Sequence, residues 1–155
     1  MPKFVFRFEA VLGQRRREER ARQLTVAQME RQRLDIEAFI RDCQQRIVQE
    51  KEDLRDQLGR QKAGAGVDLR NVRLQAHASL QLVGRAQQAV VTLAGVHSRL
   101  DAARAELLKA ATRRRAVEVL KERQLEAWKQ ESERREARAL DELIVSRAGR
   151  TEADS

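Results

Sequence analysis

The fold follows from one stretch, LVGRAQQAVVTLAGVHSRLDAARAELLKA, which spans residues 82–110. Reading it in alternating steps of four and three residues selects only apolar side chains: Leu82, Ala86, Ala89, Leu93, Val96, Leu100, Ala103, Leu107 and Ala110. An apolar stripe that repeats every 3.5 residues or so is typical of a left-handed coiled coil, because a straight helix would carry the stripe away from its partner. This stripe, the second seam, therefore predicts a helix that packs against another helix.

The N-terminal part of the chain carries a ladder with the same steps, the first seam. It runs Phe8, Leu12, Arg15, Glu19, Arg22, Val26, Met29, Arg33, Ile36, Ile40, Cys43, Ile47, Glu50, Leu54 and Gln57. Nine of these fifteen positions are apolar, so this seam is weaker than the second one but continuous in phase. It supplies the partner that the second seam needs.

A glycine-rich segment separates the two seams. Gly59, Gly64 and Gly66 fall close together, and glycine disfavours helix interiors while adopting turn conformations readily. Asp68 is placed to cap the helix that follows. We predict one all-α domain at residues 1–148, a long antiparallel coiled-coil hairpin with helix 1 at about 4–60, a turn at about 61–67 and helix 2 at about 68–147. Gly149 is expected to end helix 2 and leave residues 149–155 as a frayed tail.

The two seams also predict the register of the hairpin. If the chain reverses between Gly64 and Ala65, residues whose numbers sum to 129 face each other. The two ladders then mesh at every layer, with the pairs Leu12–Val117, Val26–Ala103, Met29–Leu100, Ile36–Leu93, Ile40–Ala89, Cys43–Ala86 and Ile47–Leu82. A homodimeric coiled coil without a hairpin is an alternative, and the glycine-rich turn argues against it.

Composition limits the function classes. Charged residues make up 36% of the chain and aromatic residues 3%, which is typical of long helices and not of a compact globule. The net charge of +8 favours acidic protein surfaces, nucleic acid or anionic membranes as partners. With a single cysteine, no bilayer-length apolar run and no secretory signal, the expected location is the cytoplasm.

No pattern in the sequence suggests catalysis. His77 and His97 have no carboxylate partners at useful spacing, and Cys43 falls on the first seam, where a small apolar side chain is wanted. The glycines near residue 64 lack the lysine and hydroxyl residues of a phosphate-binding loop. We therefore expect a protein that is not an enzyme and has no cofactor and no metal.

Two features suggest a partner-binding surface at the end of the hairpin. Arg15, Arg16 and nearby arginines fall at the same height as Arg114 and Arg115, so that Arg15 faces Arg114 in a basic collar. The carboxylates beside the collar are expected to dilute its repulsion without cancelling it. Because Met1 pairs with Trp128 in this register, about 20 residues from Lys129 onward would project alone, roughly 30 Å of helix. Leu140, Leu143 and Ile144 lie on that projecting end without an intramolecular partner.

The two ends of the chain resemble the FliJ family, small coiled-coil proteins of the flagellar type III export apparatus. The N-terminal match is Lys3, Phe4, Phe6, Arg7, Phe8, Val11 and Leu12, followed by basic and acidic residues with Glu18 and Glu19. The C-terminal match is Arg115-Ala-Val-Glu118, Leu120-Lys-Glu-Arg123, Trp128, Glu131, Glu136 and Leu140-Asp-Glu142. The resemblance implies an antiparallel coiled coil similar to the central stalk of rotary ATPases.

The resemblance also implies partners. These are a hexameric export ATPase, an export-gate membrane protein and export chaperones, which would place the chain at the cytoplasmic face of the inner membrane. Resemblance, collar and projecting end together give twelve candidate partner-binding residues: Phe4, Phe6, Phe8, Arg15, Arg16, Arg114, Arg115, Trp128, Leu140, Asp141, Glu142 and Ile144. A stalk protein of a virulence-type injectisome and a basic coiled coil that binds nucleic acid are the alternatives. The alternation of arginines with carboxylates and the lack of an aromatic stacking platform count against nucleic acid.

Overall fold

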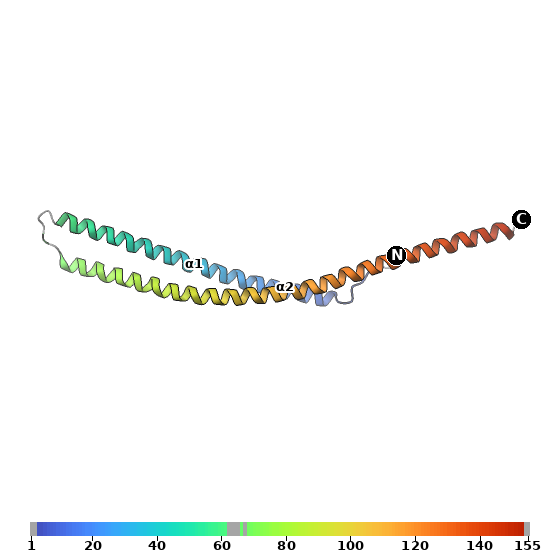
Figure 1. The fold of residues 1–155 in the computed structure, drawn as a ribbon, viewed down its shortest axis with the longest axis horizontal. Coiled ribbons are helices and arrows are strands. Elements are labelled where there is room, and N and C mark those ends of the chain that lie inside the picture. The colour runs from blue at the N-terminus through green and yellow to red at the C-terminus, as the bar shows by residue number, and fades with distance from the viewer. Residues whose placement is uncertain (1–2, 62–65, 67, 154–155) are drawn as a thin grey trace. The chain divides into compact units, whose positions relative to one another are not determined.

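The computed structural model describes residues 3–61, Gly66 and residues 68–153. Two helices make up nearly all of this part of the chain, α1 at Glu9–Gln61 and α2 at Leu69–Ala153. They pack against each other as an all-α helical hairpin, which confirms the predicted fold class (Figure 1). Contacts along the backbone divide the chain into unit 1, Met1–Arg20 with Leu108–Ser155, and unit 2, Ala21–Leu107. The single domain expected from the sequence stays a prediction.

The first helix begins later than expected, close to the start of the first seam at Phe8. We expected it at about residue 4, whereas α1 begins at Glu9 and the segment before it is non-helical. The Glu9 amide donates a hydrogen bond to the Phe6 carbonyl oxygen at 3.2 Å, and the Leu12 amide donates to the Phe8 carbonyl oxygen at 3.0 Å. An acidic residue in the first turn suits the positive end of the helix dipole. Contacts of the N-terminal aromatic side chains, described below, hold the preceding residues out of the helix.

The second helix begins where the sequence predicted. The amides of Arg70 and Asn71 donate hydrogen bonds to Asp68 Oδ1 at 3.1 and 3.3 Å, which confirms Asp68 as the cap. The C-terminal boundary was wrong, since α2 continues through Gly149 to Ala153. Glycine costs a helix only about 1 kcal/mol, and it ends one only where a competing conformation is favoured. Of the predicted turn, residues 62–65 and 67 lie outside the described residues.

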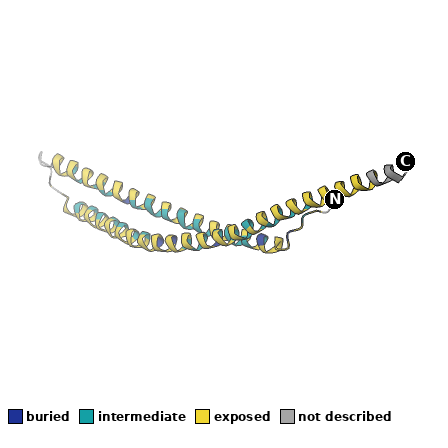
Figure 2. Cartoon of the chain, turned by 45° about the vertical axis from the view of Figure 1, so that its right-hand side comes forward, coloured by how far each residue is buried: buried dark blue, intermediate teal, exposed yellow. Residues whose placement is uncertain are grey.

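Burial along α2 follows the predicted period closely. All nine positions of the second seam are buried or half-buried, and between them every residue except Glu106 is exposed. Val96 and Leu100 are almost completely enclosed, as is Cys43 on α1. Figure 2 shows the buried and half-buried residues of unit 2 following the line along which α1 and α2 face each other. The core of this unit is therefore a thin seam, as the composition indicated.

Contacts between the helices agree with an antiparallel pairing. In unit 2 Ser79 Oγ donates a hydrogen bond to Glu50 Oε2 at 2.5 Å, and the numbers of these two seam residues sum to 129, as predicted. Glu30 and Arg104 form an ion pair from the positions that directly follow two seam residues. In unit 1 Arg16 and Glu118 occupy equivalent positions and lie 3.3 Å apart. The residue numbers of each of these two pairs sum to 134. Ion pairs from such flanking positions fix the register of a coiled coil.

Periodic burial stops at Trp128. The steps of four and three select buried or half-buried residues on α2 from Val72 to Trp128, but the next two positions, Glu131 and Arg135, are exposed. Every residue from Glu133 to Arg147 is exposed, as Figure 2 shows along the later part of α2. In unit 1 the N-terminal segment before α1 reaches Trp128 through Phe4, and the residues of α2 from Glu133 to Arg147 are exposed.

Candidate partner-binding surface

All twelve candidate residues belong to unit 1. Those with numbers up to 16 lie in its first segment, and those from Arg114 onward lie in its second. The structure separates them into three groups: an aromatic clasp at the N-terminus, an ion-pair cluster in the seam, and an exposed apolar group near the end of α2. Only the third group is wholly exposed.

The aromatic clasp joins the N-terminal segment to α2. The rings of Phe4 and Trp128 lie 6.1 Å apart between centroids at an angle of 57°, and Phe6 meets Phe8 edge-on at 5.9 Å. Phe6 is 5% exposed. Aromatic pairs of this geometry add about 0.5–1.5 kcal/mol beyond the burial of their area. Phe4, Phe6 and Trp128 therefore contribute to the internal packing of unit 1, and Phe6 offers almost no surface to a partner.

Lys121 completes the clasp, and the sequence analysis missed it. Its Nζ lies 2.7 Å from Glu9 Oε2 and 5.8 Å from the centroid of the Phe6 ring. The ammonium group thus contacts both the first turn of α1 and the buried aromatic side chain, a cation–π arrangement. Extending the second seam by its own steps beyond Ala110 selects Arg114, Val117 and Lys121 in turn. That extension is the signal that could have identified Lys121.

The ion-pair cluster occupies the seam itself. Arg114 forms ion pairs with Glu19 on α1 and with Glu118 one turn along α2, the latter at 2.5 Å. Arg16 reaches Glu118 from the other helix at 3.3 Å. The side chains of Glu19 and Glu118 are only 14% and 19% exposed, so water screens these pairs less than it screens pairs on an open surface.

These pairs correct the expected basic collar. Arg15 and Arg114 were expected to face each other with their repulsion uncancelled, whereas each has a carboxylate partner. Arg15 pairs with Glu18 at 3.0 Å, and Arg115 pairs with Glu122 at the same distance. The cause is spacing, because carboxylates three, four or seven residues away on the same helix and at the facing seam position all come within reach of an arginine side chain. Exposed guanidinium surface remains at Arg16 and Arg115, whose side chains are 47% and 57% exposed.

The arginines change the acidity of Glu118. Burial alone would raise the pKa of this carboxyl group. The hydrogen bond from Arg16 and the charges of Arg114, Arg16 and Arg115 outweigh burial and hold the pKa of Glu118 below its usual range. Glu118 is therefore ionised at neutral pH and joins the two helices of unit 1 electrostatically.

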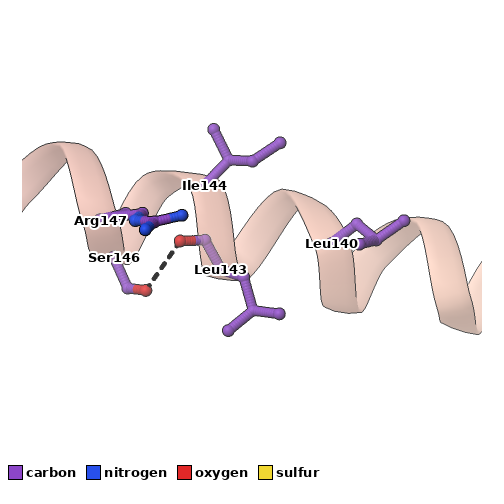
Figure 3. A pocket seen from close by; sticks show the side chains of 5 residues that line it. All are labelled: Leu140, Leu143, Ile144, Ser146 and Arg147. Atoms are coloured by element: carbon purple, nitrogen blue, oxygen red, sulfur yellow. Dashed lines mark hydrogen bonds between the residues drawn. The ribbon is translucent and has the colours of Figure 1, made fainter.

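The exposed apolar group lies on the part of α2 after Trp128. Leu140, Leu143 and Ile144 are 61%, 65% and 65% exposed, as the sequence analysis expected for a projecting end. Figure 3 shows the neighbouring side chains of Leu143 and Ile144 diverging from each other, with Leu140 about one turn away along the same surface. Ser146 Oγ donates a hydrogen bond to the Leu143 carbonyl oxygen at 3.0 Å, and Arg147 completes this surface. Asp141 and Glu142 are also exposed.

A membrane span requires a long apolar helix, and a metal site requires a cluster of ligating side chains. None of the described helices combines the length and the apolar character that crossing a membrane demands. Within the described ranges no three histidine, cysteine or carboxylate side chains gather as a metal site would require.

Comparison with known proteins identifies the family. The model of the flagellar FliJ protein family matches residues 4–153. No curated protein and no solved structure matches the chain. The matched range includes the aromatic clasp, the ion-pair cluster and the exposed apolar group. The chain therefore belongs to the FliJ family and is a coiled-coil protein related to flagellar export.

Proposed function

We propose that this chain is a non-enzymatic component of the flagellar export apparatus that uses unit 1 to bind the hexameric export ATPase. In this role it couples the ATPase to the export-gate membrane protein, at the cytoplasmic face of the inner membrane, and escorts export chaperones. Family membership supports the general role, and the features of unit 1 support the assignment of a surface.

The exposed apolar group is the observation that carries the proposed surface. Full burial of a leucine or isoleucine side chain stabilises a complex by about 1.5–3 kcal/mol, and such residues rarely gather on an unpaired helix without a binding role. Leu140 and Ile144 are each more than half exposed and lie on one side of α2, one turn apart. They are the proposed anchors, and Asp141 lies beside them, whereas Glu142 lies on the opposite side of the helix.

The remaining arginine surface gives the proposed site its charge preference. Arg16 and Arg115 each neutralise a carboxylate on one side and remain about half exposed on the other. Acidic groups that line a ring would meet these guanidinium groups, and such complementarity raises the association rate and selects the partner more than it raises affinity. Arg15 and Arg114, which are less exposed, support their neighbours by holding Glu18, Glu19 and Glu118 in place.

The aromatic clasp has a supporting role in this proposal. Phe4, Phe6, Phe8 and Trp128 hold the N-terminal segment against α2, so that the start of α1 and the middle of α2 enter the ATPase as one preorganised surface. A preorganised surface loses less conformational entropy when it binds.

Two aspartate substitutions test the surface. We expect Leu140→Asp combined with Ile144→Asp to lower the affinity for the ATPase, and the stimulation of ATP hydrolysis, by about tenfold or more. The reason is that burying two carboxylates without partners opposes association. The unfolding midpoint should stay unchanged, since neither residue is packed. Val91→Asp is the matched control, because Val91 is 67% exposed but lies in unit 2. Equal loss in the control, or unchanged ATPase binding in the double variant, would contradict the proposal.

Two alternatives have their own tests. The net charge of +8 favours nucleic acid binding, which predicts an affinity that falls steeply with salt for nonspecific DNA. The ion pairs of unit 1 count against it, because they neutralise arginines that DNA would otherwise contact. An injectisome homologue would bind an injectisome ATPase in preference to the flagellar one, so competition between the two ATPases separates these roles.

A further inference from the structure

The part of α2 after Trp128 carries a stripe whose chemistry changes along its length. On one side of the helix, at steps of three and four residues, lie Glu133, Glu136, Leu140, Leu143 with Ile144, and Arg147. The stripe is thus acidic toward its N-terminal end, apolar in its centre and basic toward its C-terminal end. All of these residues are exposed. We refer to them together as the polarised stripe.

The polarised stripe is not a continuation of the seam. Continuing the seam beyond Trp128 in steps of three and four selects Glu131, Arg135, Arg138 and Glu142, which are all charged, and only then the exposed Val145. Leu140 lies two residues from Arg138 and from Glu142, or about 200° around the helix. The apolar centre of the stripe therefore faces away from the line along which α2 packs in unit 1. It forms a separate exposed surface.

We propose that a second copy of this chain binds the polarised stripe, with the two segments antiparallel. An antiparallel arrangement about the centre of the stripe places Leu140 of each copy against Leu143 and Ile144 of the other. It also places Glu136 of each copy opposite Arg147 of the other, and the two-fold axis makes each contact twice. A parallel arrangement would set Glu136 against Glu136 and Arg147 against Arg147. Of the two orientations, only the antiparallel one therefore pairs acidic groups with basic groups and apolar groups with apolar groups.

The size of the stripe limits the strength of this contact. Fifteen residues of helix, Glu133 to Arg147, extend roughly 22 Å at about 1.5 Å per residue. A helix pair of that length buries less surface than a standard stable interface, so the dimer is weak and depends on concentration. If the proposed function holds, the second copy covers Leu140 and Ile144, and the dimer competes with the export ATPase. The dimer must then dissociate before the ATPase can bind these residues.

Charge reversals test the pairing on the full chain. Sedimentation velocity over protein concentrations up to about 500 µM should show a reversible monomer–dimer equilibrium. Glu136→Arg alone and Arg147→Glu alone should each weaken dimerisation by about tenfold, because each places like charges opposite each other twice. An equimolar mixture of the two variants should regain dimers, since their stripes then match each other. Arg138→Glu, on the other side of the helix, is the control and should change nothing.

The mixture of the Glu136→Arg and Arg147→Glu variants distinguishes the antiparallel dimer from other dimer arrangements. A wild-type chain that stays monomeric over the whole range would overturn the proposal. Dimers that ignore both single reversals, or variants that remain monomeric when mixed, would overturn it as well. The proposed function has a separate readout. A wild-type chain that binds the ATPase but forms no dimers rejects only the self-association, and ATPase binding that persists in Leu140→Asp with Ile144→Asp rejects only the proposed function.

Discussion

The seams of the two units differ in the share of charged residues that they contain. In unit 2 the helices meet mainly through apolar layers, and Val96, Leu100 and Cys43 are each no more than 2% exposed. In unit 1 the enclosed Leu12 shares the seam with Arg15, Glu19, Arg114 and Lys121, so that ion pairs and an aromatic clasp add to the apolar packing. Burial of apolar area stabilises a fold, whereas buried ion pairs contribute little net stability and favour one arrangement of partners. We therefore expect the apolar layers of unit 2 to contribute more stability and the charged seam of unit 1 to contribute more specificity.

The largest expected effect is the loss of an apolar layer in unit 2. Leu100→Ala should lower the free energy of unfolding by about 2–4 kcal/mol, because the enclosed side chain leaves a cavity. Urea denaturation followed by circular dichroism measures it. A loss below about 1 kcal/mol would mean that the seam collapses around the missing atoms. It would contradict the larger contribution to stability expected from the apolar layers of unit 2.

Reversal of a seam charge in unit 1 should have a smaller but clear effect. Arg114→Glu brings a third carboxylate to Glu19 and Glu118, and we expect a loss of about 1–3 kcal/mol in the free energy of unfolding. The neighbouring Arg113→Glu, at an exposed position, is the matched control and should cost under about 0.5 kcal/mol. Equal melting temperatures for the two variants would show that Arg114 adds nothing specific to the seam.

Acid should weaken the contribution of Glu118. Because the folded state holds the pKa of Glu118 below its unfolded value, this carboxylate stabilises the fold above the unfolded pKa of about 4.3 and loses that contribution as the pH falls through the folded value. The Glu118→Gln variant should therefore be less stable than the wild type at pH 7, and the difference should vanish in strong acid. A difference that is constant with pH would show that packing and not charge accounts for it.

The smallest expected effect is at the C-terminal end of α2. Leu140→Ala should change the free energy of unfolding by less than about 0.5 kcal/mol, because Leu140 is 61% exposed and covers nothing. The same substitution at Leu100 supplies the comparison, with identical atoms removed. Similar losses at the two positions would mean that Leu140 is packed in the folded monomer.

Sequence periodicity predicted the hairpin because the seam is local in sequence and regular in space. Every position of the second seam proved buried or half-buried, and Asp68 caps α2 as expected. The N-terminal boundary could not be read in the same way. The first seam itself begins at Phe8, and Phe4 and Phe6 precede it at a spacing of two residues; outside the helix they contact Trp128 and Lys121, more than a hundred residues away.

Charge was harder to predict than apolar packing. Counting arginines suggested a repulsive collar, whereas Glu19 and Glu118 neutralise Arg114 from two helices. Long charged side chains reach partners several positions away, so their pairing depends on side-chain conformations that the sequence does not determine. The exposure of Leu140 and Ile144 was easier to foresee, because the register left no residue of the first helix to cover them.

The aromatic clasp gives the molecule an optical reporter. Trp128 is the only tryptophan and the chain has no tyrosine, so intrinsic fluorescence comes from one ring, 6.1 Å from Phe4. Its emission responds to whether the N-terminal segment lies on α2, while circular dichroism follows the helices of both units. Unfolding curves from the two signals will coincide only if both units melt together. An early change in fluorescence would mark release of the N-terminus as a separate step, observable without any label.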